Sequence, residues 1–270
     1  MTLLVFDIET VPDTEAGARL YDLQGLSEDD IVAALSHLRR QESPNQKLLR
    51  HHLQRIVAIS VVRVDETGIN VQSLGDLETP EKELIKKFFA GIDYYKPTLI
   101  SWNGGGFDLP VLHYRAMLHG LTASTYWDVG ETKTFPSKGD VSSKGEPPSK
   151  WNNYISRYHL KHTDLMDLLS LYQPKATARL DDMAVLLGFP GKLGMDGSQV
   201  WPAFQRGELD KIRQYCETDV LNTYLVYLRF QLFRGALNQY EYEACLQVVR
   251  DYLAKNSHQP HFKTFLEIWE

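Results

Sequence analysis

Near its N-terminus the chain carries an apolar run that ends in two carboxylates, Leu3-Leu4-Val5-Phe6-Asp7-Ile8-Glu9-Thr10. This run predicts a β-strand over residues 2–9. Because side chains alternate between the two faces of a strand, Asp7 and Glu9 would project from the same face. Carboxylates held that close repel each other and raise each other's pKa, unless a metal ion or a base compensates their charge. The pair therefore favours a site for a hard divalent metal ion, with two solvent-facing acids as the plainer alternative.

The composition is that of an ordinary globular protein. The chain has 270 residues, 43% of them hydrophobic, which is enough for one large domain. No apolar stretch reaches the roughly 18 residues that a membrane span needs, and two acids stand where a secretory signal would need basic residues before an apolar core. We therefore expect a cytoplasmic protein whose cysteines, Cys216 and Cys245, are reduced thiols.

The charge distribution limits how the chain could bind nucleic acid. A formal net charge of −6 excludes coating of nucleic acid by bulk attraction, so that any contact must be local. One candidate surface is the segment from Lys133 to His162, which contains six lysine and arginine residues and only two acidic residues. A second basic stretch runs from Arg39 to Arg55. A solvated surface is the plainer interpretation of both stretches.

Hydrophobic periodicity predicts an α/β chain in which helices follow a central sheet. After the first strand, residues 11–55 are predicted to form a helical insertion. Further strands are predicted at 56–64, 69–74 and 98–102. Helices are predicted at 80–89, 107–119, 208–233, 240–254 and 262–268. Residues 132–153 are rich in Lys, Ser, Gly and Pro, which is typical of a mobile loop. The order predicts a single domain over 1–270 with a mixed central sheet and a helical C-terminal addition over 236–270.

Two further acids could join the first pair. Asp108 follows the break Asn103-Gly104-Gly105-Gly106 at the carboxyl end of a predicted strand, a usual place for sites in α/β folds, although a helix cap is the alternative. Asp219 lies one helical turn after Tyr215, so that both side chains project from one face of the predicted helix. A neutral phenol at this place could orient a water molecule, because its unperturbed pKa is about 10.

Three segments together resemble the DnaQ-like, or DEDD, 3′→5′ exonucleases, which have the ribonuclease H-like fold. Phe6-Asp7-Ile8-Glu9-Thr10 resembles the first motif of that family. The stretch from Asn103 through Phe107-Asp108-Leu109-Pro110 resembles the second motif, in the form found in proofreading domains of family-B DNA polymerases. Tyr215-Cys216-Glu217-Thr218-Asp219 resembles the third motif in its Y-x-x-x-D version, which marks the tyrosine branch. The segments occur in the family's order and span about residues 1 to 230.

This resemblance implies a set of catalytic residues and two metal ions. The acids that would hold two Mg²⁺ or Mn²⁺ ions are Asp7, Glu9, Asp108 and Asp219, and Tyr215 would position the attacking water. Groups near the terminal nucleotide would be Thr10, Asn103 and Phe107. Asp164 is a possible additional acid, although a helix cap explains it equally well.

The chain departs from the family pattern in two places. The insertion at 11–55 separates the first motif from the next strand by more than a compact member needs, and three glycines would loosen the second motif. No polymerase palm fits in the rest of the chain. The chain therefore resembles a free-standing relative of the proofreading exonuclease domain.

We expect a metal-dependent 3′→5′ exonuclease that hydrolyses phosphodiester bonds at the 3′ end of single-stranded DNA and releases nucleoside 5′-monophosphates by a two-metal-ion mechanism. All-carboxylate ligands favour Mg²⁺ or Mn²⁺ over zinc. Within the basic loop, Lys144 and Lys150 are candidates for binding the strand, and the expected partner is single-stranded nucleic acid, DNA rather than RNA, with no membrane. Two alternatives stay open. An exoribonuclease or oligoribonuclease could use the same site, and a catalytically inactive nucleic-acid-binding module could retain the fold.

Overall fold

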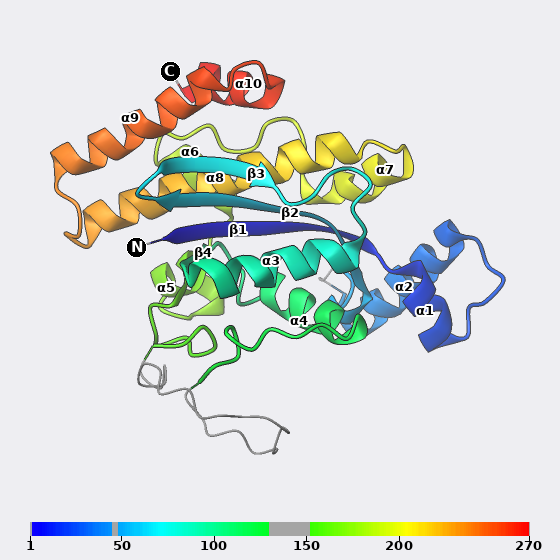
Figure 1. Cartoon of the computed structure of the whole chain (residues 1–270). Coiled ribbons are helices and arrows are strands. Elements are labelled where there is room, and N and C mark those ends of the chain that lie inside the picture. Colours follow the sequence, from blue (N-terminus) through cyan, green and yellow to red (C-terminus); the bar gives the residue numbers. More distant parts are fainter. Residues whose placement is uncertain (1, 45–47, 130–151, 270) are drawn as a thin grey trace.

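The fold is built on a mixed sheet with the first strand at its centre (Figure 1). The computed structural model describes residues 2–44, 48–129 and 152–269. In these ranges the strand order is β3-β2-β1-β4-β5. The strands are β1 (Leu3–Pro12), β2 (Gln54–Asp65), β3 (Gly68–Ser73), β4 (Thr98–Ser101) and β5 (His162–Asp164). Strands β1 to β3 pair antiparallel, whereas β4 runs parallel to β1 and β5 runs parallel to β4. This is the ribonuclease H-like arrangement that the sequence predicts.

Helices cover both faces of the sheet, so that β1 is buried on both sides. Helices α3 (Glu81–Tyr95) and α4 (Asp108–Leu118) pack on one face against Leu4, Phe6 and Ile8. The long helix α8 (Leu209–Phe233) crosses the other face and packs in the same cluster as Val5. Strict alternation along β1 therefore turns Asp7 and Glu9 toward α8, as the sequence predicts.

The remaining helices lie at the ends and on the α8 side. Between β1 and β2 the chain forms α1 (Thr14–Tyr21), α2 (Glu28–Glu42) and the short 3₁₀ turn η1 (His51–Leu53), which confirms helices in the predicted insertion. The segment after β5 contains α5 (Leu165–Leu169), η2 (Pro174–Ala176), α6 (Leu180–Leu186), η3 (Gly197–Gln199) and α7 (Val200–Gln205). Beyond α8, the chain ends in α9 (Gln239–Lys255) and α10 (Pro260–Trp269), which lie outside α8 in Figure 1. None of the helices in the described ranges is both long and apolar enough to pass through a bilayer.

Two predicted boundaries are wrong and one strand was missed. The first strand continues to Pro12 instead of ending at residue 9, because the start of β2 pairs with Thr10 to Pro12 beyond a register shift after Glu9. Helix α3 continues to Tyr95, well past the predicted end. Strand β5 was not predicted at all, since its three residues are too few to show an alternating pattern. The predicted loop at 132–153, including Lys144 and Lys150, lies almost entirely outside the described residues.

Candidate functional site

The two acids of β1 lie beside a thiol on α8. Cys216 donates through Sγ to the main-chain oxygen of Asp7 at 3.5 Å and to its carboxylate Oδ2 at 3.6 Å. One potential ligand atom from each of Asp7, Glu9 and Cys216 lies within 4.8 Å of the others. Burial raises the pKa of the Cys216 thiol well above its ordinary value, so the sulfur is protonated. It therefore serves as a hydrogen-bond donor to Asp7 and does not supply a thiolate that would favour zinc.

Asp108 reaches the same place from the first turn of α4. Strand β4 pairs with β1 only over Leu3 to Val5, and no other described strand pairs with the following part of that edge. There the main-chain N–H of Ile8 donates to Oδ1 of Asp108 at 3.0 Å. The N-cap position of α4 is Phe107, which has no polar side chain to cap the helix, and Asp108 is the first helical residue. The carboxylate of Asp108 thus joins α4 to β1 between the two acids of the first motif, instead of capping its own helix.

The glycine-rich segment before Asp108 is closely packed, which corrects the expectation that three glycines loosen it. A Cβ on Gly104 would lie 2.4 Å from Oγ of Ser101, far inside van der Waals contact. Asn103 begins the turn in the left-handed conformation at φ 62°. On the outer side, Nε2 of His51 in the insertion hydrogen-bonds with the main-chain oxygen of Gly106 at 3.0 Å. Gly104 is therefore required for space, and the insertion is attached directly to this loop.

Asp164 holds the loop from the other side. Its carboxylate accepts from the N–H groups of Asn103 at 2.9 Å and Gly105 at 2.8 Å. It also caps α5 by accepting from Met166 and Asp167. Asp164 is thus a helix cap, as one interpretation of the sequence predicts. It also lies near the other acids, because its charge adds to burial in raising the pKa of Asp108. Four N–H groups engage its oxygens, which favours an anchoring role.

Helix α8 supplies the last acid and the tyrosine. Asp219 is buried, and its Oδ1 has no hydrogen-bond partner among the described residues. The hydroxyl of Tyr215, one turn earlier, accepts from Nζ of Lys192 at 2.8 Å. Burial raises the pKa of Tyr215 well above its usual value, so the phenol is neutral. The helix thus presents an unpaired carboxylate oxygen and an oriented phenol side by side.

Lys192 is the site residue that the sequence reasoning missed. It lies in the segment between α6 and η3, where a single lysine has no periodic signal. Asn222 on α8 fixes that segment, since its side chain donates to the main-chain oxygen of Gly191 at 2.8 Å and accepts from the Gly191 N–H at 3.2 Å. Gly191 itself has φ 68°. The signal that could have pointed here is Asn222, an amide side chain on the buried side of a helix.

Burial raises the pKa of all four acids, and the charges of the other clustered acids raise those of Asp7 and Glu9 further. For Asp7, burial and then the charges of Asp108, Glu9 and Asp219 raise the pKa well above its ordinary value. Burial also raises the pKa of Glu9 strongly, and Lys192 opposes this rise. Burial raises the pKa of Asp108 to about 7 and that of Asp219 to about 6. These acids therefore sense one another although they come from β1, α4 and α8.

The residues present fit a divalent cation. Buried carboxyls with raised pKa values, an unpartnered oxygen on Asp219 and an oxygen donor set are the features that a hard cation would satisfy. Residues that could hold such an ion are Asp7, Glu9, Asp108 and Asp219.

The other predicted substrate contacts have local partners. Thr10 donates through its hydroxyl to Oε1 of Gln54 at 3.0 Å. Phe107 packs its ring against His51, with the ring centroids 5.5 Å apart. Asn103 forms the turn described above. Lys144 and Lys150 lie outside the described residues, so the structure does not place them.

A family model described as "Predicted 3'-5' exonuclease related to the exonuclease domain of PolB" matches residues 46–269. The chain belongs to this family. The matched range includes the elements that carry Asp108, Tyr215 and Asp219, and it begins after β1. The chain is thus a predicted 3′→5′ exonuclease related to polymerase proofreading domains. Nuclease domains of this kind depend on metal ions, in agreement with the acidic cluster.

The chain is also similar to part of two DNA polymerases. A DNA polymerase of Archaeoglobus fulgidus is 22% identical over 204 residues, which cover 72% of this chain and 24% of the polymerase. The solved structure of the family B DNA polymerase from the hyperthermophilic archaeon Pyrobaculum calidifontis is 17% identical and has a TM-score of 0.49, covering 86% of this chain and 24% of the polymerase. The chain spans about a quarter of the length of the polymerases that it matches.

Proposed function

We propose that this chain, as one exonuclease domain over residues 1–270, removes nucleotides from the 3′ end of single-stranded DNA in the manner of the tyrosine branch of the DEDD exonucleases. The supporting observation is the convergence of Asp7, Glu9, Asp108 and Asp219 from three separate parts of the chain. A bound cation would offset the burial and repulsion that raise these pKa values, and it would give the unpartnered Oδ1 of Asp219 a partner. We propose DNA rather than RNA as the substrate because the relative matched by sequence is a DNA polymerase.

In the proposed mechanism the four acids hold two Mg²⁺ or Mn²⁺ ions. When bound, such a pair of ions activates a water molecule and stabilises the leaving 3′ oxygen during an in-line attack on phosphorus. The products are nucleoside 5′-monophosphates. Glu9, Asp108 and Asp219 are buried and Asp7 is partly buried, and this shielding from solvent strengthens the interaction of the acids with cations.

Tyr215 orients the attacking water in this proposal. Its phenol stays protonated, so it can donate a hydrogen bond but cannot serve as the base. Because Lys192 already donates to the phenol oxygen, the Tyr215 proton points away from Lys192. It is then free to donate to Asp219 or to a water that Asp219 helps to hold.

The binding of the strand is proposed to use the basic segment that contains Lys144 and Lys150. Replacing both residues with alanine should weaken binding of single-stranded DNA and flatten its salt dependence. With fewer phosphates contacted, fewer counterions are released from the DNA on binding. The measurement is the dissociation constant at several salt concentrations. An unchanged salt slope would contradict a phosphate contact.

The decisive test is digestion of 5′-labelled single-stranded DNA and of matched RNA with Mg²⁺ or Mn²⁺. The wild-type chain should produce a ladder that shortens from the 3′ end, faster on DNA. Asp7→Ala should abolish the ladder and Tyr215→Phe should reduce it. Matched controls are Asp210→Ala and Tyr227→Phe, which alter the same residue types on α8 away from the cluster.

If the folded wild-type protein cleaves neither polymer with either metal ion, the proposed function is wrong. Faster digestion of RNA would instead identify an exoribonuclease that uses the same site. Binding of either polymer without any cleavage would indicate an inactive binding module.

A further inference from the structure

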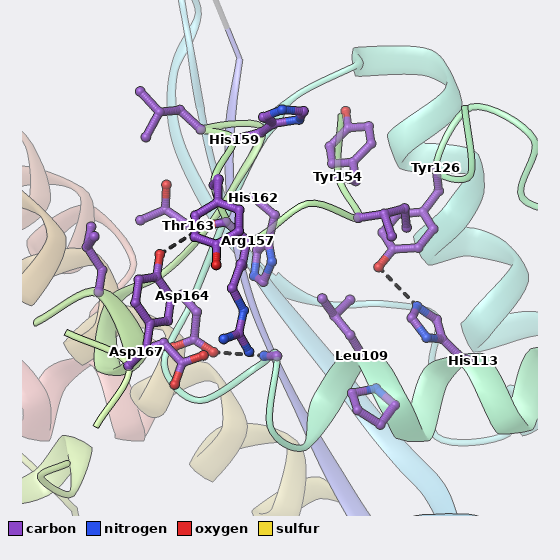
Figure 2. A pocket seen from close by; sticks show the side chains of 17 residues that line it. Leu109, His113, Tyr126, Tyr154, Arg157, His159, His162, Thr163, Asp164 and Asp167 are labelled. Carbon is purple, nitrogen blue, oxygen red and sulfur yellow. Dashed lines mark hydrogen bonds between the residues drawn. The ribbon is translucent and has the colours of Figure 1, made fainter. Parts of the chain in front are cut away.

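A cavity lies next to the loop that precedes Asp108, beside the edge strand β5 (Figure 2). Its volume is about 390 Å³, within the usual size range of small-molecule sites. Gly105 and Asp164 line one end, and Leu109, the residue after Asp108, lines the wall. The cavity is thus continuous with the elements that build the acid cluster, although none of the four clustered acids lines it.

We propose that this cavity is a subsite for one unstacked nucleobase of the strand whose 3′ end lies at the acid cluster. The inference rests on the proposed function, because it takes the bound strand from there. It adds a specific place for a base and a set of residues that would contact it.

Aromatic rings form the floor and the rim of the cavity. Tyr126 and Tyr154 are stacked in the floor, with centroids 5.6 Å apart and planes at 18°. Their hydroxyls are already engaged, with Nε2 of His113 at 3.0 Å and with the main-chain oxygen of Pro97 at 2.8 Å. At the rim, Tyr158 and Tyr172 meet edge to face, and Tyr158 is largely exposed. A base entering from solvent would therefore meet open aromatic surface first, which suits stacking.

The backbone at the rim takes an unfavourable conformation that directs Tyr172. Leu171 and Tyr172 both have left-handed backbones, at φ 51° and 59°. Bulky L-residues rarely adopt this conformation, and two in succession are more unusual. The Tyr172 N–H donates to the main-chain oxygen of Asp167 at 2.7 Å, and its hydroxyl donates to the main-chain oxygen of Arg157 at 2.9 Å. Strain that the surrounding contacts maintain in this way is typical of binding sites.

A donor and an acceptor are available at the same end of the cavity. Figure 2 shows the Arg157 side chain directed toward Asp164 and Asp167. Arg157 stacks on the Tyr172 ring, 5.1 Å from its centroid. Burial and the charge of Asp164 raise the pKa of Asp167, and the guanidinium opposes this rise. Within the described residues neither the guanidinium nor the Asp167 carboxylate has a side-chain hydrogen bond of its own. A base edge carries both donors and acceptors, which this pair could match.

The charges favour a base over a phosphate. The cavity is lined by two carboxylates, those of Asp164 and Asp167, and by one guanidinium. Asp164 is occupied by four N–H groups, so that Asp167 is the acceptor left for a ligand. A phosphate would be repelled by these acids, whereas the amino group of a base would be attracted.

The test combines substitutions in the protein with abasic sites in the bound strand. A catalytically inactive background, Asp7→Ala, allows binding of labelled single-stranded oligonucleotides to be measured by fluorescence anisotropy. In a series of strands, one nucleotide at a time is replaced by an abasic site, counting from the 3′ end. At one position the abasic strand should bind roughly five- to 150-fold more weakly, the range expected for one base stacked on aromatic residues.

Tyr172→Leu or Asp167→Asn in the same background should remove that penalty at that position and leave the other positions unchanged. Asp182→Asn on α6 is the matched control, and it should retain the full penalty. Asp167→Asn keeps the side-chain shape, so it remains informative if Tyr172→Leu fails to fold.

Equal abasic penalties with and without the cavity substitutions would overturn the inference, and so would undetectable binding of any strand. Because anisotropy needs no cleavage, this result is separate from the ladder test. A cleaving enzyme with no position-specific coupling would retain the proposed function and lose the subsite.

Discussion

Replacing Lys192 with methionine should slow hydrolysis strongly while leaving strand binding almost unchanged. Nζ of Lys192 donates to the Tyr215 hydroxyl at 2.8 Å, and the ammonium lies 5.3 Å from the centroid of the tyrosine ring. Its charge also opposes the rise in pKa that burial causes at Glu9 and at Asp219. Methionine retains much of the aliphatic stem and removes the charge and the donor.

The expected size follows from the lost hydrogen bond. A hydrogen bond from a charged group contributes about 1.5–3 kcal/mol. If the bond orients Tyr215 only for the reacting geometry, this loss corresponds to roughly a ten- to 150-fold lower kcat with little change in KM. Because the charge of Lys192 holds two carboxyl pKa values down, its removal should also shift the acidic limb of the pH–rate profile to higher pH.

The assay is steady-state digestion of a 5′-labelled single strand across pH, with Lys211→Met as control. Lys211 pairs with Glu208 on the surface at 2.7 Å, and its side chain is 57% exposed, so its replacement should change little. The double variant Lys192→Met with Tyr215→Phe tests the route, because effects that share one hydroxyl should not add. An unchanged kcat in Lys192→Met would refute the role of the lysine, and fully additive effects would refute its action through Tyr215.

Other predictions concern stability and the loop before Asp108. Arg115→Met should lower the free energy of unfolding in urea by about 3–5 kcal/mol, because it removes the guanidinium that neutralises the buried carboxylates of Asp13 and Glu81. Arg50→Met, at an exposed pair with Glu42, should cost less than about 1 kcal/mol, and equal losses in the two variants would contradict this reasoning. Without divalent ions, the folded protein binds more protons than the unfolded chain between the ordinary aspartate pKa of 3.8 and the folded pKa of about 7 for Asp108, so Tm should fall as pH rises through that window. Asp108→Asn should make the fall of Tm with pH less steep, and Mg²⁺ should raise Tm more at pH 8 than at pH 5. The same slope of Tm against pH in the wild type and in Asp108→Asn would contradict the role of this buried carboxyl. Gly104→Ala should lose most activity, because its Cβ would meet Ser101 at 2.4 Å, whereas Gly105→Ala, whose nearest neighbour would be Asp164 at 3.3 Å, should retain most of it; the reverse order of activities would show that the loop is not packed as described.

Elements with strong local signals could be predicted from the sequence. The hairpin was readable because Asp65-Glu66-Thr67-Gly68 separates two alternating runs, and β2 and β3 indeed end and begin at Asp65 and Gly68. Strand β1 was readable as a continuous apolar run because both its sides are buried, and the period of two then placed Asp7 and Glu9 on one face. Strand β5 was not, since it depends on pairing with β4 across a connection of more than fifty residues and has almost no pattern of its own.

The site residues also fall into those with a local sequence pattern and those placed by long-range contacts. Asp7, Glu9, Asp108, Tyr215 and Asp219 could be singled out because acids at strand ends and helix starts, and a Tyr and an Asp one turn apart, are visible as patterns. The structure brings these side chains together, and their catalytic roles stay predictions. Lys192 could not be found, because its position depends on the contact between Asn222 and Gly191, which joins two distant segments. The anchoring contacts of His51 and Asp164 with the loop are likewise long-range.

The central place of β1 has a consequence for the order in which the protein forms. Its acids are synthesised before the rest of the sheet, yet the parallel partner of β1 starts only at Thr98, and the last acid lies at Asp219. Contacts between residues so distant along the chain form slowly, because long loops must close before they are stabilised. A nascent chain would therefore hold an incomplete set of acids until α8 has emerged and packed.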